Sequence, residues 1–211
     1  MLVRKNKLKL LSARRIAVAL PLVIALATPH LATIAGALVV AASLAIFSDA
    51  RAATFAHGPW LRSVGIGVLC GVAIALIVAF GLDQLIATLM GAEPDLSSFD
   101  RVKGSTSQFL LLLLIGIIWG GVVEETIFRG FVIGWGCSLF GARAQLSLTL
   151  VSAAVFGFAH LYQGWSGVIT TGILGLGYGL AYIATGRNLL TAIAMHATVN
   201  VFGVTELYLG L

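Results

Sequence analysis

The chain has 211 residues, of which 59% are hydrophobic and only 10% are charged, whereas an ordinary soluble domain carries roughly 25% charged residues. This composition excludes a soluble domain and favours one compact helical membrane domain, because each crossing needs about 20 apolar residues. The long uninterrupted apolar runs also exclude a membrane β-barrel, whose strands alternate over about ten residues.

The formal net charge of +5 does not indicate nucleic-acid binding, because six of the thirteen basic residues lie in the first fifteen positions, MLVRKNKLKLLSARR. This cluster is better interpreted as a topology signal that also contacts anionic lipids. A cleaved signal peptide is the competing interpretation. Apolar sequence nevertheless continues to Phe47 without a clean cleavage site, so we expect the first helix to be retained.

Apolar runs, separated by polar or Gly/Pro breaks, predict an all-α polytopic bundle of about seven membrane helices. In chain order the expected crossings are about 10–28, 30–48, 63–90, 107–137, 145–162, 166–185 and 188–209. The main loop, GAEPDLSSFDRVKGSTS, separates three N-terminal helices in residues 1–95 from a second bundle in residues 96–211.

The distribution of basic residues predicts a cytosolic N-terminus. With that orientation only Arg101 and Lys103 lie outside, and Arg129 lies within the membrane. The ten basic residues on the inside are Arg4, Lys5, Lys7, Lys9, Arg14, Arg15, Arg51, Arg62, Arg143 and Arg187. This is a strong positive-inside bias. It also places the C-terminus outside.

Ionisable groups within membrane helices are rare and usually face a bundle interior or a water-filled cavity, so each is a functional candidate. Glu125 and Arg129 are four residues apart and can pair on one helix face, while Glu124 points about 100° away from Glu125. His160 follows Phe156 by four residues on another helix. His196 and Asn200 share a face of a third.

Depth provides a crude test of whether these faces meet. At 1.5 Å per residue from the cytosolic turns, Glu124 and His160 lie about 25 Å deep, His196 about 13 Å and Asn200 about 20 Å. The depths of the three polar faces are therefore close enough for these side chains to meet in one site. Structural roles remain open for each group: a buried ion pair for Glu125 and Arg129, a packing histidine for His160, and an interhelical clasp for His196 with Asn200.

Two other features have simpler interpretations. Glu206, near the end of the last helix, is expected to reach toward the membrane surface. The glycines of GILGLGYGL could suggest a phosphate-binding loop, but no strand precedes them and no lysine follows. Close helix packing is the expected role of these glycines.

The ordered set Glu124-Glu125-x-x-x-Arg129, Phe156-x-x-x-His160 and His196-x-x-x-Asn200 resembles the signature of the CPBP family, which includes CAAX prenyl endopeptidases, bacteriocin-processing enzymes and bacterial relatives. The resemblance covers about residues 105–205, so the second bundle would be the catalytic one. The N-terminal half is similar only as generic membrane helices.

This resemblance implies an intramembrane endopeptidase of the CAAX-processing type. Glu124 would be the general base that activates water, His160 would position that water, and His196 with Asn200 would stabilise the oxyanion. Glu125, Arg129 and Phe156 would support the site. Amide hydrolysis needs these elements, namely an activated water and donors directed at developing negative charge.

A zinc site is the alternative mechanism, with Glu124, His160 and His196 as ligands. The usual HExxH motif is absent, and an asparagine donor is less necessary where a metal polarises the carbonyl. We therefore favour a metal-free glutamate mechanism without a cofactor. We also expect a polar cavity that opens toward the cytosol or laterally to lipid.

Two other functional classes remain open: a non-catalytic membrane scaffold or bacteriocin-immunity protein of the same family, and a proton-linked transporter. The transporter hypothesis rests on membrane Glu and His residues alone, since no inverted repeat is visible. The expected partners of the protease are the lipid bilayer and a membrane-associated peptide or protein, with prenylated substrates as one option. The expected location is a prokaryotic plasma membrane.

Overall fold

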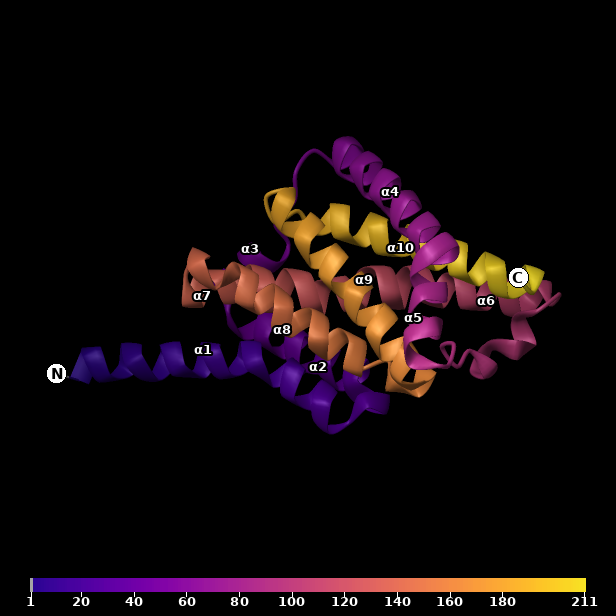
Figure 1. The fold of residues 1–211 in the computed structure, drawn as a ribbon. Coiled ribbons are helices and arrows are strands. Elements are labelled where there is room, and N and C mark those ends of the chain that lie inside the picture. Colours follow the sequence, from indigo (N-terminus) through magenta and orange to yellow (C-terminus); the bar gives the residue numbers. More distant parts are fainter. Residues whose placement is uncertain (1) are drawn as a thin grey trace.

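The computed structural model describes residues 2–211, and the side chains of these residues except for positions 2–6, 30 and 32. All regular secondary structure of the described residues is helical, and they contain no strand. This confirms the predicted all-α membrane bundle. Figure 1 shows α4 and α9 running obliquely to α1 and α6, with the start of α1 extending beyond the other helices.

The N-terminal part contains α1 (Leu2–Ala27), α2 (Ala32–Ile46) and α3 (Ser48–Thr54), and a short 3₁₀ turn, Pro29–Leu31, joins α1 to α2. The chain bends by 120° between α2 and α3. The bend occurs at Phe47, whose backbone is extended. The expected crossing at 30–48 is therefore followed by a short helix that turns away from it.

The third predicted crossing is one long helix in the structure. It comprises α4 (Trp60–Ile77), a π-helical turn (Val78–Leu82) and α5 (Asp83–Met90). A loop with one 3₁₀ segment, Ser97–Val102, follows and leads to α6. Here and below, residues 91–105 are called the connecting loop.

The fourth predicted crossing contains the two adjacent glutamates. It runs from α6 (Thr106–Ile115) through two π-helical segments, Gly116–Glu124 and Thr126–Trp135, into α7 (Gly136–Phe140). Three further helices complete the bundle: α8 (Gln145–Phe158), α9 (Gly164–Ala184) and α10 (Leu189–Leu209), with short 3₁₀ turns at Ala142–Ala144 and Leu161–Gln163.

Five of the described helices are long and apolar enough to cross a membrane, and the bent pair α2 and α3 raises the number to six. The apolar helix at Ala142–Phe158 is shorter than a full crossing. The structure thus confirms a polytopic bundle, whereas the count of seven and the cytosolic N-terminus remain predictions.

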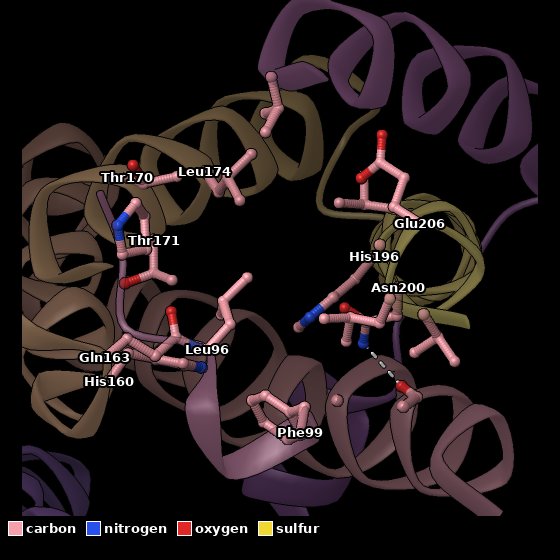
Figure 2. Close-up of a pocket in the computed structure, with 18 of the residues that line it drawn as sticks. Leu96, Phe99, His160, Gln163, Thr170, Thr171, Leu174, His196, Asn200 and Glu206 are labelled. Atoms are coloured by element: carbon pink, nitrogen blue, oxygen red, sulfur yellow. Dashed lines mark hydrogen bonds between the residues drawn. The ribbon is translucent and has the colours of Figure 1, made fainter. Parts of the chain in front are cut away.

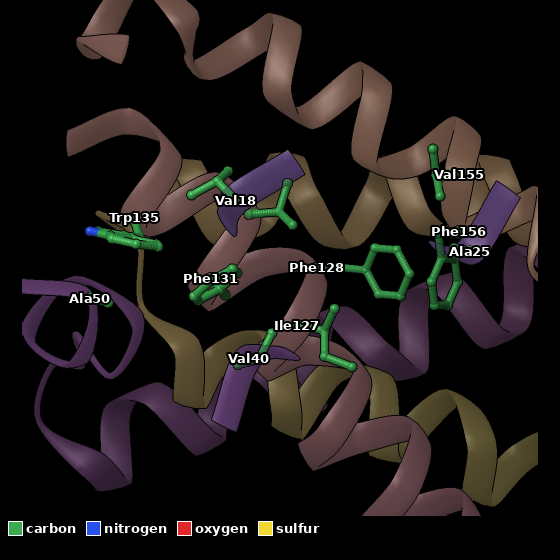
Figure 3. Packing of buried hydrophobic residues seen from close by; sticks show 11 residues of the cluster. Val18, Ala25, Val40, Ala50, Ile127, Phe128, Phe131, Trp135, Val155 and Phe156 are labelled. Atoms are coloured by element: carbon green, nitrogen blue, oxygen red, sulfur yellow. The ribbon is translucent and has the colours of Figure 1, made fainter. Parts of the chain in front are cut away.

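The core lies around the second π-helical segment. Phe128, Phe131 and Trp135 are buried there and pack against residues of α1, α2 and α3. Figure 3 shows these rings together with the aliphatic side chains that surround them. Trp135 also donates its Nε1–H to Asp49 Oδ2 over 2.9 Å, which satisfies a polar group that burial would otherwise leave unpaired.

Hydrogen bonds identify which turns lie at the same end of the bundle. At one end, the amide of Leu189 donates to Ala56 O over 3.0 Å. At the opposite end, the amide of Asp95 donates to Gln163 O over 2.9 Å, and the amide of Gly104 donates to Tyr208 O over 3.0 Å. We call this second end the loop end, because it carries the connecting loop.

Glycines of α9 allow close approach to α8, as predicted. A Cβ on Gly179 would lie 2.6 Å from Thr149 Cγ2, and one on Gly175 would lie 2.9 Å from the Phe156 ring. Real Cβ atoms do not make such short contacts, so these two positions require glycine. The backbone of α9 is thereby brought next to the polar residues of the fourth crossing.

Candidate active site

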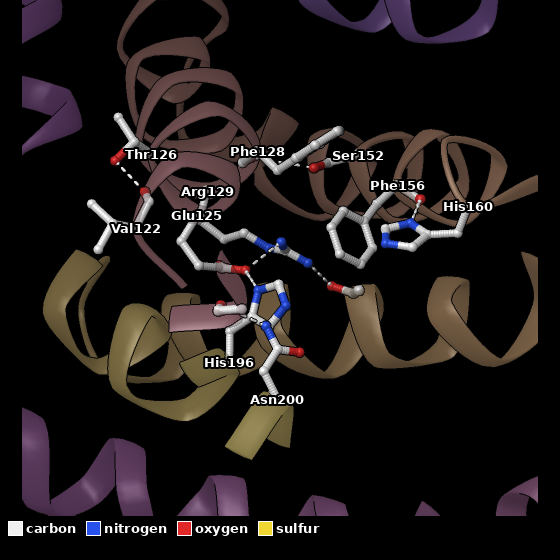
Figure 4. A network of polar contacts seen from close by, with 12 residues as sticks. Val122, Glu125, Thr126, Phe128, Arg129, Ser152, Phe156, His160, His196 and Asn200 are labelled. Atoms are coloured by element: carbon white, nitrogen blue, oxygen red, sulfur yellow. Dashed lines mark hydrogen bonds and ion pairs between the residues drawn. The ribbon is translucent and has the colours of Figure 1, made fainter. Parts of the chain in front are cut away.

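Glu125 is at the centre of a buried polar network (Figure 4). Its Oε1 accepts a hydrogen bond of 2.7 Å from Arg129 Nη1 and one of 2.8 Å from His196 Nδ1. The Glu125 and Arg129 side chains have no exposed surface, and that of His196 is 6% exposed. A buried charge is tolerated only when paired and hydrogen-bonded, and Arg129 supplies that pairing.

Arg129 has further partners that the sequence did not predict. Its Nη2 donates to the Gly175 carbonyl over 2.7 Å, and its guanidinium carbon lies 4.8 Å from the Phe156 ring centroid and 5.2 Å from that of Tyr178. A cation over an aromatic face is stabilised by the ring quadrupole. The single positive charge is therefore enclosed by one carboxylate, one carbonyl and aromatic rings.

Tyr178 also contacts the histidine of the network. Its ring stacks on that of His196, with centroids 4.7 Å apart and an interplanar angle of 26°. Phe156 approaches the same histidine edge-on at 5.9 Å. The His196 ring is thus fixed by a carboxylate at Nδ1 and by aromatic rings around it, which leaves Nε2 as its free polar atom.

Glu124 differs from its neighbour in that it lines a pocket. The pocket has a volume of about 470 Å³ and is bordered by the fourth crossing, α5, α8, α9, α10 and the connecting loop. Glu124 is 8% exposed, and no hydrogen bond to its side chain is found among the described residues. A carboxylate in this position is desolvated yet remains accessible to a molecule in the pocket.

The pocket brings together all four residues predicted to be catalytic: Glu124, His160, His196 and Asn200. In Figure 2, His196 and Asn200 extend into it from α10, while His160 lies on the opposite side with Gln163 and residues of α9. Of the predicted supporting residues, Phe156 also lines the pocket. Glu125 and Arg129 do not line it and are fully buried behind it.

The tautomer of His160 follows from its hydrogen bond. Its Nδ1 lies 2.8 Å from the carbonyl oxygen of Phe156, and a carbonyl oxygen can only accept, so Nδ1 carries the proton. In the neutral ring Nε2 is then an acceptor. His160 is consequently arranged to accept a hydrogen bond from a water molecule in the pocket.

The Asn200 side chain is held in place by one hydrogen bond from its amide nitrogen. Nδ2 donates to the Gly116 carbonyl over 2.8 Å, and because an amide nitrogen carries two protons, one donor remains available. Gly120 provides the space beside it: a Cβ there would overlap with Asn200 Nδ2 and lie 3.3 Å from His196 Nε2. Gly120, four residues before Glu124, thus lies directly against Asn200 and His196, the two predicted oxyanion donors.

The helix that carries the glutamates is not the regular α-helix assumed from the sequence. Residues on both sides of Glu125 form π-helical segments, a backbone geometry that is often found at functional sites. The predicted pair of Glu125 and Arg129 nevertheless forms. The different environments of Glu124 and Glu125, inferred from α-helical geometry, are also present.

The alternative zinc site does not fit these side chains. No group of three or more His, Cys, Asp or Glu side chains within the described part of the chain is arranged to hold a metal ion. His196 already uses Nδ1 to bond Glu125. Glu124, His160 and His196 share a pocket without forming a ligand set, and we therefore derive no step through zinc.

Two carboxylates of the pocket were not identified as site residues. Glu206 was expected to reach toward the membrane surface, but it lines the pocket, as does Asp83 on α5. Tyr178 and the Gly175 carbonyl were also missed, since an aromatic residue or a backbone oxygen in an apolar helix has no sequence signal. The pocket includes residues of the connecting loop and so lies at the loop end of the bundle, which the basic residues predict to be outside. The expected opening was toward the cytosol or laterally to lipid.

Comparison with known families agrees with the motif-based resemblance. A model described as "Type II CAAX prenyl endopeptidase Rce1-like" matches residues 106–202, which is just under half of the chain. No curated protein and no solved structure matches. The matched segment includes the fourth crossing and most of α10, and hence every predicted catalytic residue. Residues 106–202 of this polytopic membrane protein are therefore similar to the Rce1-like family of type II CAAX prenyl endopeptidases.

Proposed function

We propose that the protein is an intramembrane endopeptidase that hydrolyses a peptide bond with a water molecule activated by Glu124. The observation that carries the proposal is the pocket position of this carboxylate, which is buried, has no hydrogen-bond partner among the described residues, and lines the same pocket as His160. The family match supports the same reaction class.

In the proposed mechanism, Glu124 removes a proton from water while His160 Nε2 accepts the other water proton in a hydrogen bond. The water oxygen then attacks the scissile carbonyl. A general base contributes roughly 10²–10⁴-fold to such a reaction when it is well positioned. Glu124 would afterwards transfer its proton to the leaving amine, which returns the carboxylate to its starting state.

Stabilisation of the oxyanion is assigned to Asn200 and His196. The free Nδ2 proton of Asn200 donates directly. His196 donates from Nε2 only as an imidazolium, because Glu125 already accepts the Nδ1 proton. In this role Glu125 orients the donor and offsets its positive charge, while Arg129 holds Glu125 in place. Neither residue touches the substrate. Each oxyanion donor of this kind contributes about 10²–10³-fold.

The test uses purified protein in lipid nanodiscs and a library of membrane-anchored peptides, with products identified by mass spectrometry. Wild type is expected to release defined fragments, and Glu124→Gln is expected to release none while remaining folded. Equal cleavage by Glu124→Gln would reject the assigned base. Binding of peptides by wild type without any product would instead favour the scaffold hypothesis.

A further inference from the structure

A second pocket lies at the end of the bundle opposite the loop end. It has a volume of about 350 Å³ and is formed by the starts of α4 and α10 and the end of α9. Its polar lining consists of Arg62, Ser63, Thr185, Asn188 and Thr191, and no described carboxylate lines it. None of these residues takes part in the proposed hydrolysis.

Two long helices begin at this pocket. α4 and α10 start at the same end of the bundle and run in parallel (Figure 1), and they pack so closely that a Cβ on Gly67 would lie 2.6 Å from Thr191 O. The amides of a first helical turn have no acceptor within the helix, and the aligned peptide dipoles place a partial positive charge there. The pocket therefore receives two positive helix ends, which favour an anion.

The start of α4 has free backbone donors. Among the described residues, no acceptor is found for the amides of Trp60, Leu61 and Arg62. At the start of α10, by contrast, the amide of Leu189 donates to Ala56 O over 3.0 Å. The first turn of α4 is thus the part of the pocket that offers backbone amides to a ligand.

Arg62 adds a full positive charge. It lies in the first turn of α4, is exposed, and forms no ion pair among the described side chains. The two segments that form the pocket, residues 58–66 and 184–191, contain no aspartate or glutamate. The segments that place this guanidinium at the pocket therefore supply no counter-ion for it.

Thr191 provides the independent observation that indicates a ligand. Its side chain has no exposed surface, it lines the pocket, and its Oγ1 has no hydrogen-bond partner among the described residues. Buried hydroxyl groups are normally hydrogen-bonded. The neighbouring Asn188 donates one Nδ2 proton to Ser63 Oγ over 2.6 Å, and its second Nδ2 proton remains available. The pocket thus combines a hydroxyl, an amide donor and a guanidinium.

These donors suit an anion with several oxygen atoms. A guanidinium can bond two oxygens of a phosphate at once, and helix N-termini bind the same group. Trp60 and Leu61, which are exposed beside Arg62, suit the boundary between lipid and water. The headgroup phosphates of the bilayer lie at that boundary, and the basic residues predict that this end of the bundle faces the cytosol.

We propose that this pocket binds a phosphate group, with Arg62, Asn188 and Thr191 as side-chain donors and the first turn of α4 as the source of backbone donors. The exposed Trp60 and Leu61 favour the headgroup of an anionic membrane lipid over free phosphate. The bound group joins the start of α4 to the start of α10. Its binding does not depend on the proposed endopeptidase function.

The first experiment measures thermal unfolding of the full-length protein in neutral detergent. Short-chain phosphatidic acid, short-chain phosphatidylcholine and inorganic phosphate are compared with sodium chloride at equal ionic strength. A ligand that binds only the folded protein raises Tm, and we expect phosphatidic acid to raise it by about 5 °C or more at 100 times its Kd. An equal rise with inorganic phosphate would assign the site to free phosphate. No rise with either phosphate compound would overturn the proposal.

The second experiment uses variants matched in charge. Arg62→Gln should raise the Kd for phosphatidic acid about tenfold or more, because it removes a charged hydrogen-bond donor. Arg143→Gln is the control, since Arg143 is also exposed but does not line the pocket. The affinity of the control should equal that of wild type. An equal loss of affinity in both variants would indicate general charge attraction and overturn the site.

The third experiment tests the unpaired hydroxyl. Without ligand, Thr191→Val should unfold at the same temperature as wild type or at a higher one, because it removes a buried hydroxyl without a partner. It should nevertheless bind phosphatidic acid more weakly. Thr198→Val is the control on the same helix: Thr198 Oγ1 donates to Ala194 O over 2.7 Å, and Thr198 does not line the pocket. Wild-type affinity in both Thr191→Val and Arg62→Gln would overturn the proposal, whatever the result of the cleavage assay.

Discussion

His196 Nδ1 lies 2.8 Å from Glu125 Oε1, across 71 positions of sequence. This contact joins α10 to the fourth crossing and fixes the orientation of the histidine toward the pocket. The same oxygen of Glu125 is bonded to Arg129. One carboxylate oxygen thus connects the ion pair to the proposed oxyanion donor, while the adjacent Glu124 remains free.

The first prediction separates the two glutamates. Glu125→Gln leaves the buried Arg129 without its counter-ion, and losing one partner of a buried pair typically costs about 3–5 kcal/mol. Glu124→Gln removes a carboxylate without hydrogen-bond partners among the described residues and should leave stability nearly unchanged. Thermal unfolding in detergent and peptide cleavage, measured on both variants, check this. A stable and active Glu125→Gln protein would contradict the assigned structural role.

Part of this arrangement was predictable from the sequence, because charged side chains are energetically costly in apolar membrane helices and are therefore functional candidates. The spacing of Glu125 and Arg129 predicted their ion pair, and the three motifs predicted a shared site. The bond from His196 to Glu125 was not predictable, since it depends on how two helices are placed in three dimensions. The bond from Arg129 to the Gly175 carbonyl was equally unpredictable. Every residue carries a backbone carbonyl, and the sequence does not show which of them a side chain will reach.

Apolar runs predicted most of the membrane helices for a similar reason: burial in lipid demands long apolar segments and satisfied backbone groups. The bend after Ile46 was missed, because the apolar pattern shows length but not direction. The π-helical segments were missed too, because the apolar pattern does not distinguish a π-helical turn from an α-helical one. Glu206 was misplaced because its position near a helix end says nothing about which face it occupies.

The second prediction concerns the ring of Tyr178. Tyr178→Phe keeps the stack on His196 and the contact with Arg129, and no hydrogen bond of the hydroxyl is found among the described residues, so cleavage should persist. Tyr178→Leu removes the aromatic face and should cost about 2–4 kcal/mol with a loss of activity. Thermal unfolding and kcat of the two variants provide the measurement. A greater loss for phenylalanine than for leucine would assign a role to the hydroxyl instead.

The third prediction tests the space beside the oxyanion donors. Gly120→Ala introduces a Cβ that overlaps with Asn200 Nδ2 and approaches His196 Nε2, and displaced donors should reduce kcat by about 10²–10³-fold. Gly65→Ala is the matched control, because no atom lies within 4 Å of its Cβ. If both alanine variants cleave like wild type, Asn200 and His196 do not stabilise the oxyanion as proposed.

The fourth prediction addresses the side of the membrane on which the pocket opens. Basic residues predict that the connecting loop is outside, so a cysteine at Ser98 should react with an impermeant maleimide in intact cells. A cysteine at Arg143 should react only after permeabilisation. The native thiols Cys70 and Cys137 are first replaced by alanine. Labelling of Arg143→Cys but not Ser98→Cys in intact cells would reverse the predicted orientation.

The π-helical geometry around Glu125 has a consequence for how this membrane segment can change in evolution. Each residue of a helix turns the chain by a large angle, about 100° in an α-helix, so deleting one of residues 121–123 would rotate Gly116 and Gly120, which lie against Asn200, relative to the two glutamates. Substitutions that keep the size of a side chain are tolerable at the lipid-facing positions of this stretch. Its length is not adjustable, and related chains should align through it without insertions or deletions.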